Sequence, residues 1–256
     1  YQLLPELDQK KFKTFILRNS GGDFNKAHLR DAFMTQLVEP IDLEIQEQRP
    51  AIVYLNGKYW GIHYIREKLN EHYLKAHFDV SKDSVNLLKH RGDRQHGKKL
   101  NYPKMIQFLN THSLVDEKNM AYIESVMDVE NYISYNIAET YSDNRDAGGN
   151  IRYWRKTGEG EKWRWIFFDL DLGLNSNSKI GHKRNTVKKF TSVNYEAWPD
   201  PPWSTLIIRK LLENPRMQEL YINTFADYLN SIFCEHTGQR WPRAQTNQAP
   251  TNTKNR

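Results

Sequence analysis

Two strand-forming runs around an Asn-Gly pair are the feature that most restricts how this sequence can fold. The stretch PAIVYLNGKYWGIHYIREKL, residues 50–69, places residues of high β propensity on both sides of Asn56-Gly57. Asn-Gly is the favoured central pair of a type I′ turn, because both residues tolerate positive φ angles. The stretch therefore predicts a β-hairpin with two adjacent antiparallel strands.

Short elements on either side of this hairpin give the chain a β-rich beginning. Residues 12–18, FKTFILR, alternate and are rich in aromatic and branched side chains, which predicts a strand. Residues 26–38 carry apolar side chains at helical spacing, and Pro40 ends the predicted helix. Another short helix is predicted over 70–78, with Asn70 as its N-cap.

The rest of the chain is predicted to be mainly helical, with one further hairpin. Residues 129–142, VENYISYNIAETYS, follow a 3.6-residue period and predict a buried helix. Strands over 150–155 and 162–173, joined by KTGEGE, form the second predicted hairpin. Residues 79–101 are predicted to form a loop that contains one short strand over 84–89, and residues 102–128 are predicted to form broken helices. A long loop is predicted over 175–202, followed by two helices separated at Asn214-Pro215.

The composition excludes several classes of protein. A chain of 256 residues is long enough for one large domain or two lobes, and 38% hydrophobic residues indicate a globular protein. The net charge of +6 permits anionic ligands, but no arginine-rich helix or zinc-finger spacing indicates a nucleic-acid partner. The single cysteine excludes an internal disulfide, and the sequence shows no signal peptide or membrane span.

Oxygen-bearing side chains gather at both ends of the second predicted hairpin. Asp146 and Asn150 lie just before it, and Asp169 and Asp171 follow its last apolar run. Because the two ends of a hairpin are adjacent in space, these four side chains can converge. Oxygen ligands without Cys or His favour Mg²⁺ or Mn²⁺, and Mg²⁺ with few carboxylates usually binds together with substrate phosphates. Protein kinases use such an arrangement.

Each of these residues also has a purely structural interpretation. The sequence DAGG after Arg145 is favourable turn chemistry, so Asp146 is alternatively a turn residue. Asp169 and Asp171 are alternatively capping residues at the end of a strand. Two polar clusters that bracket one hairpin favour the functional interpretation.

Four segments resemble the CotH family, the spore-coat-protein-H kinases. They are LRNSGGDFNKAHLRDAFMTQLV, PAIVYLNGKYWGIHYIREKLNEHYL, IAETYSDNRDAGGNIRYWR and WRWIFFDLDLG, and the resemblance covers residues 10–235. It implies an α+β, two-lobed protein-kinase-like fold, with a small β-rich N-lobe over 1–68, a larger helical C-lobe over 69–236 and a polar tail over 237–256. It also implies an atypical kinase that uses ATP and Mg²⁺ or Mn²⁺ to phosphorylate a Ser or Thr hydroxyl of a protein.

The resemblance assigns roles to the acidic residues. The segment NRDAGGN matches the catalytic loop of the family, with Asp146 as the catalytic base and Asn150 as a metal ligand. The step between these two is four residues, whereas the protein-kinase motif H-R-D-x-x-x-x-N has five. Asp143 is therefore the alternative base, if the loop is registered differently. The segment DLDLG resembles the metal-binding D-x-D of the family, with Asp169 and Asp171 as ligands.

Fewer residues are assigned in the predicted N-lobe, where no glycine-rich phosphate loop is visible. Arg18 is the candidate nucleotide-binding cation, because Lys13 lies on the opposite face of the strand; a structural ion pair with Asp23 or Asp31 is the alternative. Arg30 or Asp31, on the following helix, is expected to orient the site. Glu67 follows the first hairpin, where it either contacts the nucleotide or is exposed.

Two other functions remain compatible with the sequence. The first is a pseudokinase-like scaffold that binds a nucleotide or a partner without phosphoryl transfer. The second is a metal-dependent phosphohydrolase or nuclease, with which the basic loops at 89–99 and 182–189 agree. The resemblance further implies an extracytoplasmic location, either secreted or on the cell surface.

Overall fold

The architecture is mixed α/β, with two small antiparallel sheets and eight α-helices in the part of the chain that the structure describes. The structure is a computed structural model and describes residues 2–5, 7, 11–176, 179–192 and 201–234. The strands are β1 (Phe15–Arg18), β2 (Gln48–Leu55), β3 (Lys58–Glu67), β4 (Val85–Lys89), β5 (Asp93–His96), β6 (Arg152–Lys156) and β7 (Arg164–Ile166). The helices are α1 (Arg30–Leu37), α2 (Glu71–Phe78), α3 (Tyr102–Thr111), α4 (Glu117–Val126), α5 (Val129–Ser142), α6 (Thr186–Thr191), α7 (Leu206–Leu211) and α8 (Pro215–Ser231).

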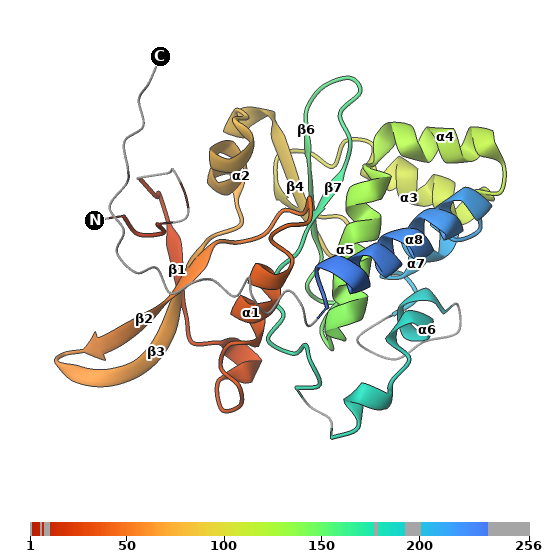
Figure 1. The fold of residues 1–256 in the computed structure, drawn as a ribbon. Coiled ribbons are helices and arrows are strands. Elements are labelled where there is room, and N and C mark those ends of the chain that lie inside the picture. The colour runs from red at the N-terminus through yellow and green to blue at the C-terminus, as the bar shows by residue number, and fades with distance from the viewer. Residues whose placement is uncertain (1, 6, 8–10, 177–178, 193–200, 235–256) are drawn as a thin grey trace, which may run out of the picture.

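The first sheet has the strand order β1-β3-β2 and confirms the predicted hairpin. Leu55 pairs with Lys58 across a two-residue turn. In that turn Asn56 has a φ of 52° and Gly57 a φ of 77°, as a type I′ turn requires. Strand β1 pairs antiparallel with β3, and its last residue, Arg18, lies opposite Tyr64. Beyond β1 the chain turns toward α1 (Figure 1).

The second sheet has the order β5-β4-β6-β7 and confirms the hairpin of β6 and β7. Strand β4 confirms the short strand predicted within 79–101, but the prediction that the rest of this region is a loop was wrong. Residues Asp93–His96 form β5, which pairs antiparallel with β4. The four residues of β5 are polar, so no apolar alternation marks them, and the strand depends on hydrogen bonds to the largely buried β4.

Helix α5 lies between the hairpin of β6 and β7 and the helices α7 and α8 (Figure 1). Of its 14 residues, Glu130 and Tyr141 alone are not buried, which confirms the predicted buried helix. Trp163, just before β7, and Trp165, on β7, are at most 1% exposed in the same core. The C-terminal end of α5, which leads into the NRDAGGN segment, is therefore anchored on several sides.

A buried carboxylate joins the segment between α1 and β2 to this core. Glu44 is 3% exposed and accepts hydrogen bonds from Trp154 Nε1 at 3.0 Å, Arg164 Nε at 2.6 Å and Asn131 Nδ2 at 2.8 Å. Burial raises the pKa of Glu44, and the Arg164 guanidinium opposes this shift. The three donors come from β6, β7 and α5, so a single side chain fixes the hairpin against the helix.

The predicted limits of several elements were wrong. Strand β1 begins at Phe15 and not at residue 12, and β7 covers Arg164–Ile166 and not 162–173. Helix α1 begins at Arg30 and not at residue 26, because the Asp23 carboxylate accepts hydrogen bonds from the backbone of Ala27 and Arg30, both at 3.1 Å. These bonds hold the chain in a tight turn before the helix. The predicted long loop over 175–202 contains the short helix α6, capped by Asn185, although residues 177–178 and 193–200 lie outside the described part.

No helix in the described ranges is both long and apolar enough to cross a lipid bilayer. The division into lobes at residue 68 stays a prediction, and the predicted tail over 237–256 lies outside the described residues.

The N-cap of α2 gives a stability test of the local fold. The side chain of Asn70 accepts hydrogen bonds from the backbone of His72 at 3.0 Å and Tyr73 at 3.1 Å. We expect Asn70→Ala to lower the free energy of unfolding by about 1 kcal/mol, because both amides lose their acceptor. Urea denaturation measures the change. The matched control is Asn230→Ala on the exposed face of α8, which we expect to be neutral within about 0.5 kcal/mol; equal effects of the two changes would contradict the capping role.

Candidate functional site

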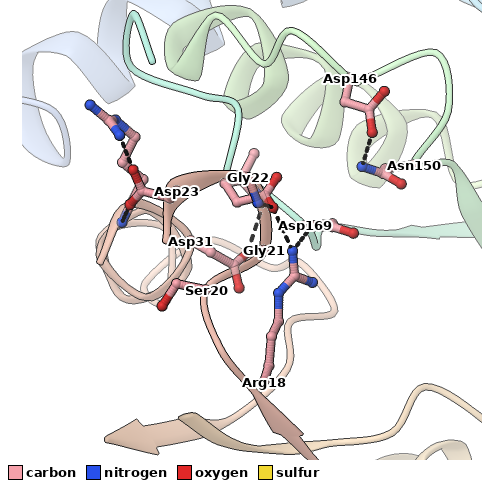
Figure 2. Close-up of polar contacts among 12 residues, drawn as sticks. Arg18, Ser20, Gly21, Gly22, Asp23, Asp31, Asp146, Asn150 and Asp169 are labelled. Carbon is pink, nitrogen blue, oxygen red and sulfur yellow. Dashed lines mark hydrogen bonds and ion pairs between the residues drawn. The ribbon is translucent and has the colours of Figure 1, made fainter. Parts of the chain in front are cut away.

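The NRDAGGN segment folds into a compact loop in which Asp146 and Asn150 are direct partners. The side chain of Asn144 accepts a hydrogen bond from the Asp146 backbone at 3.1 Å, which makes a turn at the exit of α5. The backbone amide of Asn150 donates to the Asp146 carbonyl at 3.1 Å, and its side-chain amide donates to Asp146 Oδ2 at 2.9 Å (Figure 2). The four-residue step thus brings the candidate base and the candidate metal ligand into contact.

The DLDLG segment presents two carboxylates to a single cation. Arg18 Nη2 donates to Asp169 and, at 2.9 Å, to Asp171 Oδ2 (Figure 2). The same Asp171 oxygen accepts a hydrogen bond from the backbone amide of Gly22 at 2.6 Å. The turn after β1 and the acidic segment after β7 therefore meet, although about 150 residues separate them in the sequence.

The glycine pair in this turn allows the close contact. Gly21 has a φ of 54°, and a Cβ there would collide with the carboxylate of Asp171 and lie 2.7 Å from Arg18 Nη2. A Cβ on Gly22 would lie 2.8 Å from Leu172 Cδ2. A side chain at either position would displace the ends of side chains beside it, and at Gly21 the positive φ adds backbone strain.

Burial and charge pairing shift the pKa values of Arg18 and Asp171. Burial by itself lowers the pKa of Arg18, but the hydrogen bond and charge of Asp169 outweigh burial and raise it. Burial, and then the negative charge of Asp169, raise the pKa of Asp171 above its ordinary value, although the Gly22 amide and Arg18 oppose the shift. The two carboxylates repel each other, so an added cation would stabilise them.

A second ion pair ties the acidic segment to α1 and β3. Asp31, 7% exposed on α1, accepts hydrogen bonds from Arg66 Nη1 at 2.7 Å and from the Leu170 backbone amide at 2.8 Å. Asp31 therefore orients the segment, as expected for Arg30 or Asp31, whereas Arg30 pairs with Asp23. The sequence analysis missed Arg66, because a charged residue near the polar end of a strand gives no sign that its charge is buried.

Backbone contacts join the two ends of the hairpin, as the sequence predicted. The Arg145 amide donates to the Leu172 carbonyl at 3.2 Å, and the Leu174 amide donates to the Ser142 carbonyl at 2.6 Å. The side-chain amide of Asn144 adds a long contact of 3.5 Å to the Asp169 carbonyl. The catalytic-loop candidate and the acidic segment are thus held side by side.

Asn144 is itself fixed by a buried acid that the sequence analysis did not single out. Glu139, 1% exposed on α5, accepts a hydrogen bond from Asn144 Nδ2 at 2.9 Å. The spacing of five residues between them, across the end of a helix, would have been a weak signal. The bond fixes the rotamer of Asn144 and thereby the turn that presents Asp146.

The four predicted oxygen ligands lie in two separate groups. Asp146 and Asn150 bond to each other, whereas Asp169 and Asp171 bond to Arg18 (Figure 2). Among the described residues, no three His, Cys, Asp or Glu side chains are close enough to hold a metal ion by themselves.

A comparison with known protein families decides the identity of the chain. The family described as CotH kinase protein matches residues 2–240, which is most of the sequence. The chain belongs to the CotH family. No curated protein matches it.

A kinase family implies ATP and a divalent metal, and the donor chemistry of the DLDLG segment fits such a metal. Asp169 and Asp171 supply hard oxygen ligands, and Asp171 keeps a raised pKa even beside Arg18. The set is incomplete without further oxygens, which the phosphates of a nucleotide would supply.

The two other candidate residues for a CotH kinase have partners of their own. Glu67 is 3% exposed, so the alternative that it is exposed was wrong. Its carboxylate contacts His77 Nε2 at 2.9 Å and accepts a hydrogen bond from the Glu47 amide at 3.1 Å. Its contact with the nucleotide stays a prediction. Asp143 caps α5 and pairs with Arg184, whose Nε donates at 3.0 Å, and with Lys189 at 3.5 Å.

The raised pKa of Asp171 predicts a pH dependence of stability. The folded protein binds a proton at this carboxyl more tightly than the unfolded chain does, so the group stabilises the fold most below its ordinary pKa of 3.8. This contribution is lost as the pH rises through the higher folded pKa. We expect the stability of Asp171→Asn, relative to the wild type, to improve as the pH rises from about 3.5 to 7 without divalent metal.

Urea denaturation at a series of pH values measures this difference. The matched control is Asp227→Asn, an exposed carboxylate on α8, which should follow the wild-type profile. A relative loss of stability in Asp171→Asn over the same range would contradict the direction of the shift.

Proposed function

We propose that this CotH-family protein transfers the γ-phosphoryl group of ATP to a Ser or Thr hydroxyl of a protein, with Mg²⁺ or Mn²⁺. The observation that carries the proposal is the meeting of three parts at one place: the Arg18 cation, the Asp169 and Asp171 carboxylates, and the loop of Asp146 and Asn150 bonded to them through the backbone. Phosphoryl transfer needs mainly positioning and charge neutralisation, which these parts supply.

Asp146 is the proposed base. Its side chain is partly buried and has one carboxylate oxygen bonded to Asn150, and the turn made by Asn144 fixes its backbone. A base held in this way orients the acceptor hydroxyl and accepts its proton as the oxygen attacks phosphorus. The rival Asp143 is already engaged by Arg184 and Lys189, which supports the assignment to Asp146.

Asn150, Asp169 and Asp171 are the proposed metal ligands. A divalent cation bound there would neutralise charge on the phosphates and shield the two carboxylates from each other. Arg18 is proposed to contact the nucleotide phosphates, since it lies between the carboxylates and has a raised pKa, so it stays charged at every physiological pH. Glu67 is proposed to act near the nucleotide, as a carboxylate whose orientation His77 fixes.

One observation favours a pseudokinase as the second candidate. Arg18 pairs with both Asp169 and Asp171, so a metal ion competes with a guanidinium for the same oxygens. A scaffold protein in which Arg18 stays paired with both carboxylates would bind a partner without phosphoryl transfer. The implied location outside the cytoplasm is likewise a proposal, which follows from the family.

Two carboxylate substitutions test the kinase directly. We expect Asp146→Asn to lower kcat for metal-dependent transfer from ATP by about 10²- to 10⁴-fold, the range for loss of a general base. Asp169→Asn should abolish the dependence of the rate on added Mn²⁺. The measurement is transfer of ³²P from ATP to protein, followed over a range of metal concentrations, with Asp227→Asn as the control.

The outcomes separate the candidate functions. Full activity of Asp146→Asn would overturn the assignment of the base, and wild-type protein that binds ATP without transfer would indicate the pseudokinase. Cleavage of a phosphodiester without ATP would indicate the phosphohydrolase.

Asp143→Asn distinguishes the two acidic residues of the loop. Asp143 pairs with Arg184 and Lys189, so we expect Asp143→Asn to lower the thermal stability. Since Asp146 is the proposed base, we expect the substitution to lower kcat by less than about tenfold. Thermal denaturation and the same transfer assay measure the two effects. A loss of kcat as large as that of Asp146→Asn, at unchanged stability, would transfer the role of base to Asp143.

A further inference from the structure

A cavity lies behind the catalytic-loop candidate, between α3, α5, α6 and the segment 203–207. Ala147 and Ile151, the neighbours of Asp146 and Asn150 in the chain, form part of its wall. Six aromatic side chains form a large part of the remaining wall, namely Tyr102, Tyr132, Tyr135, Trp165, Phe190 and Trp203. The cavity is therefore separate from the cluster around Arg18 but directly adjoins the loop that carries the proposed base.

Helix α5 places two acceptors in this aromatic wall. Asn136 is 5% exposed, and its Oδ1 atom is buried without a hydrogen-bond donor. Glu139, one turn further along the helix, adds a buried carboxylate to the same wall and bonds to Asn144. A buried acceptor without a donor is costly, so such a group in a native fold indicates that a donor from outside completes it.

The chemistry of the wall selects a cation. Burial raises the pKa of both Tyr132 and Tyr135, so these rings stay neutral. Neutral aromatic faces attract cations through the ring quadrupole, and a carboxylate adds direct attraction. The carboxylate of Glu139 and the oxygen of Asn136 disfavour an anion. Two rings of the wall already attract cations of this chain, Arg91 over Trp203 and Lys189 over Phe190.

The size of the cavity limits the ligand to a small group. It offers about 40 Å³ to the centres of water molecules, and one water needs roughly 10–15 Å³. About three water-sized groups fit, which matches the head of a guanidinium or an ammonium with its adjoining methylene. His90 and Trp203, which are half-buried, line the cavity as well, so the stem of a longer side chain has a route to solvent.

We propose that this cavity binds the cationic side chain of an Arg or Lys residue of the acceptor protein, with Asn136 and Glu139 as its polar partners. That the bound side chain belongs to the phosphate-accepting protein rests on the proposed kinase function. The cavity lies beside the proposed base, because Ala147 and Ile151 belong both to its wall and to the segment around Asp146. A basic side chain anchored there holds the acceptor chain beside the base. The cavity thereby selects acceptor hydroxyls that have a basic residue nearby.

Binding of a small cation tests the site without ATP or metal. The probe is ethylguanidinium, and the control is N-ethylurea, which has nearly the same shape and no charge. Isothermal titration at fixed ionic strength should show saturable binding of ethylguanidinium and much weaker binding of N-ethylurea. Equal binding of the two compounds, or no saturable binding of the cation, overturns the proposal.

Two variants of Asn136 locate the binding. Asn136→Leu keeps the size of the side chain but removes the acceptor, so it should bind ethylguanidinium about tenfold or more weakly, the loss expected for a hydrogen bond to a charged group. It should not lower the thermal stability, because no buried acceptor is left without a donor. Asn136→Asp adds a negative charge and should bind the cation more tightly. Unchanged affinity in both variants overturns the assignment of the cavity.

Peptide phosphorylation then tests the acceptor role. Serine peptides that carry one Arg at successive positions are compared with peptides that carry citrulline, its neutral isostere, at the same position. We expect a lower KM for the Arg peptide at one preferred spacing, and loss of this preference in Asn136→Leu. Equal KM values for Arg and citrulline at every spacing overturn the acceptor role. Binding of ethylguanidinium by a protein that transfers no phosphate supports the cation site and overturns the kinase function.

Discussion

The charge of the acidic segment after β7 is the constraint on which the site depends. Two carboxylates, Asp169 and Asp171, lie close enough to share one guanidinium nitrogen, and Arg18 and the Gly22 amide offset part of their repulsion. Arg18 is on β1 of the first sheet, and the Gly22 amide is in the turn after β1. The negative charge of the segment is therefore offset only while the first sheet stays in place. A substitution that removes Arg18 would leave two partly buried negative charges without their main partner.

Buried ion pairs hold the remaining parts of the site at fixed positions. Asp31 joins Arg66 of β3 to the backbone at Leu170, and Glu44 joins α5 to the β6–β7 hairpin. Such pairs contribute little net stability, but they are costly to break singly, because the partner left behind stays buried and charged. They therefore favour one arrangement of the sheets and helices over its alternatives.

The local features of this fold were predicted from the sequence, but the buried polar contacts were not. The Asn56-Gly57 turn, the Asn70 cap and the 3.6-residue period of α5 depend on neighbouring residues, and all three were predicted. Strand β5 and the first residue of α1 were predicted wrongly, because they depend on β4 and on the Asp23 carboxylate.

The adjacency of the two ends of the second hairpin followed from topology, and the family resemblance supplied the roles of the residues. The pairing of Arg18 with Asp169 and Asp171 was not foreseen, because the ion pair considered for Arg18 was with Asp23 or Asp31. The buried roles of Arg66 and Glu139 were not foreseen, because the burial of a single charged residue within a strand or a helix leaves no periodic signal.

The glycine pair after β1 also links the position of the first sheet to the protonation of Asp171. Gly21 and Gly22 lie so close to the carboxylate of Asp171 and the side chain of Leu172 that an added methyl group would push these side chains aside. A movement that separates the sheet from the acidic segment would break the Gly22 hydrogen bond. It would thereby remove one of the groups that oppose the raised pKa of Asp171. The separation of the sheet from the segment and the protonation of Asp171 are therefore coupled.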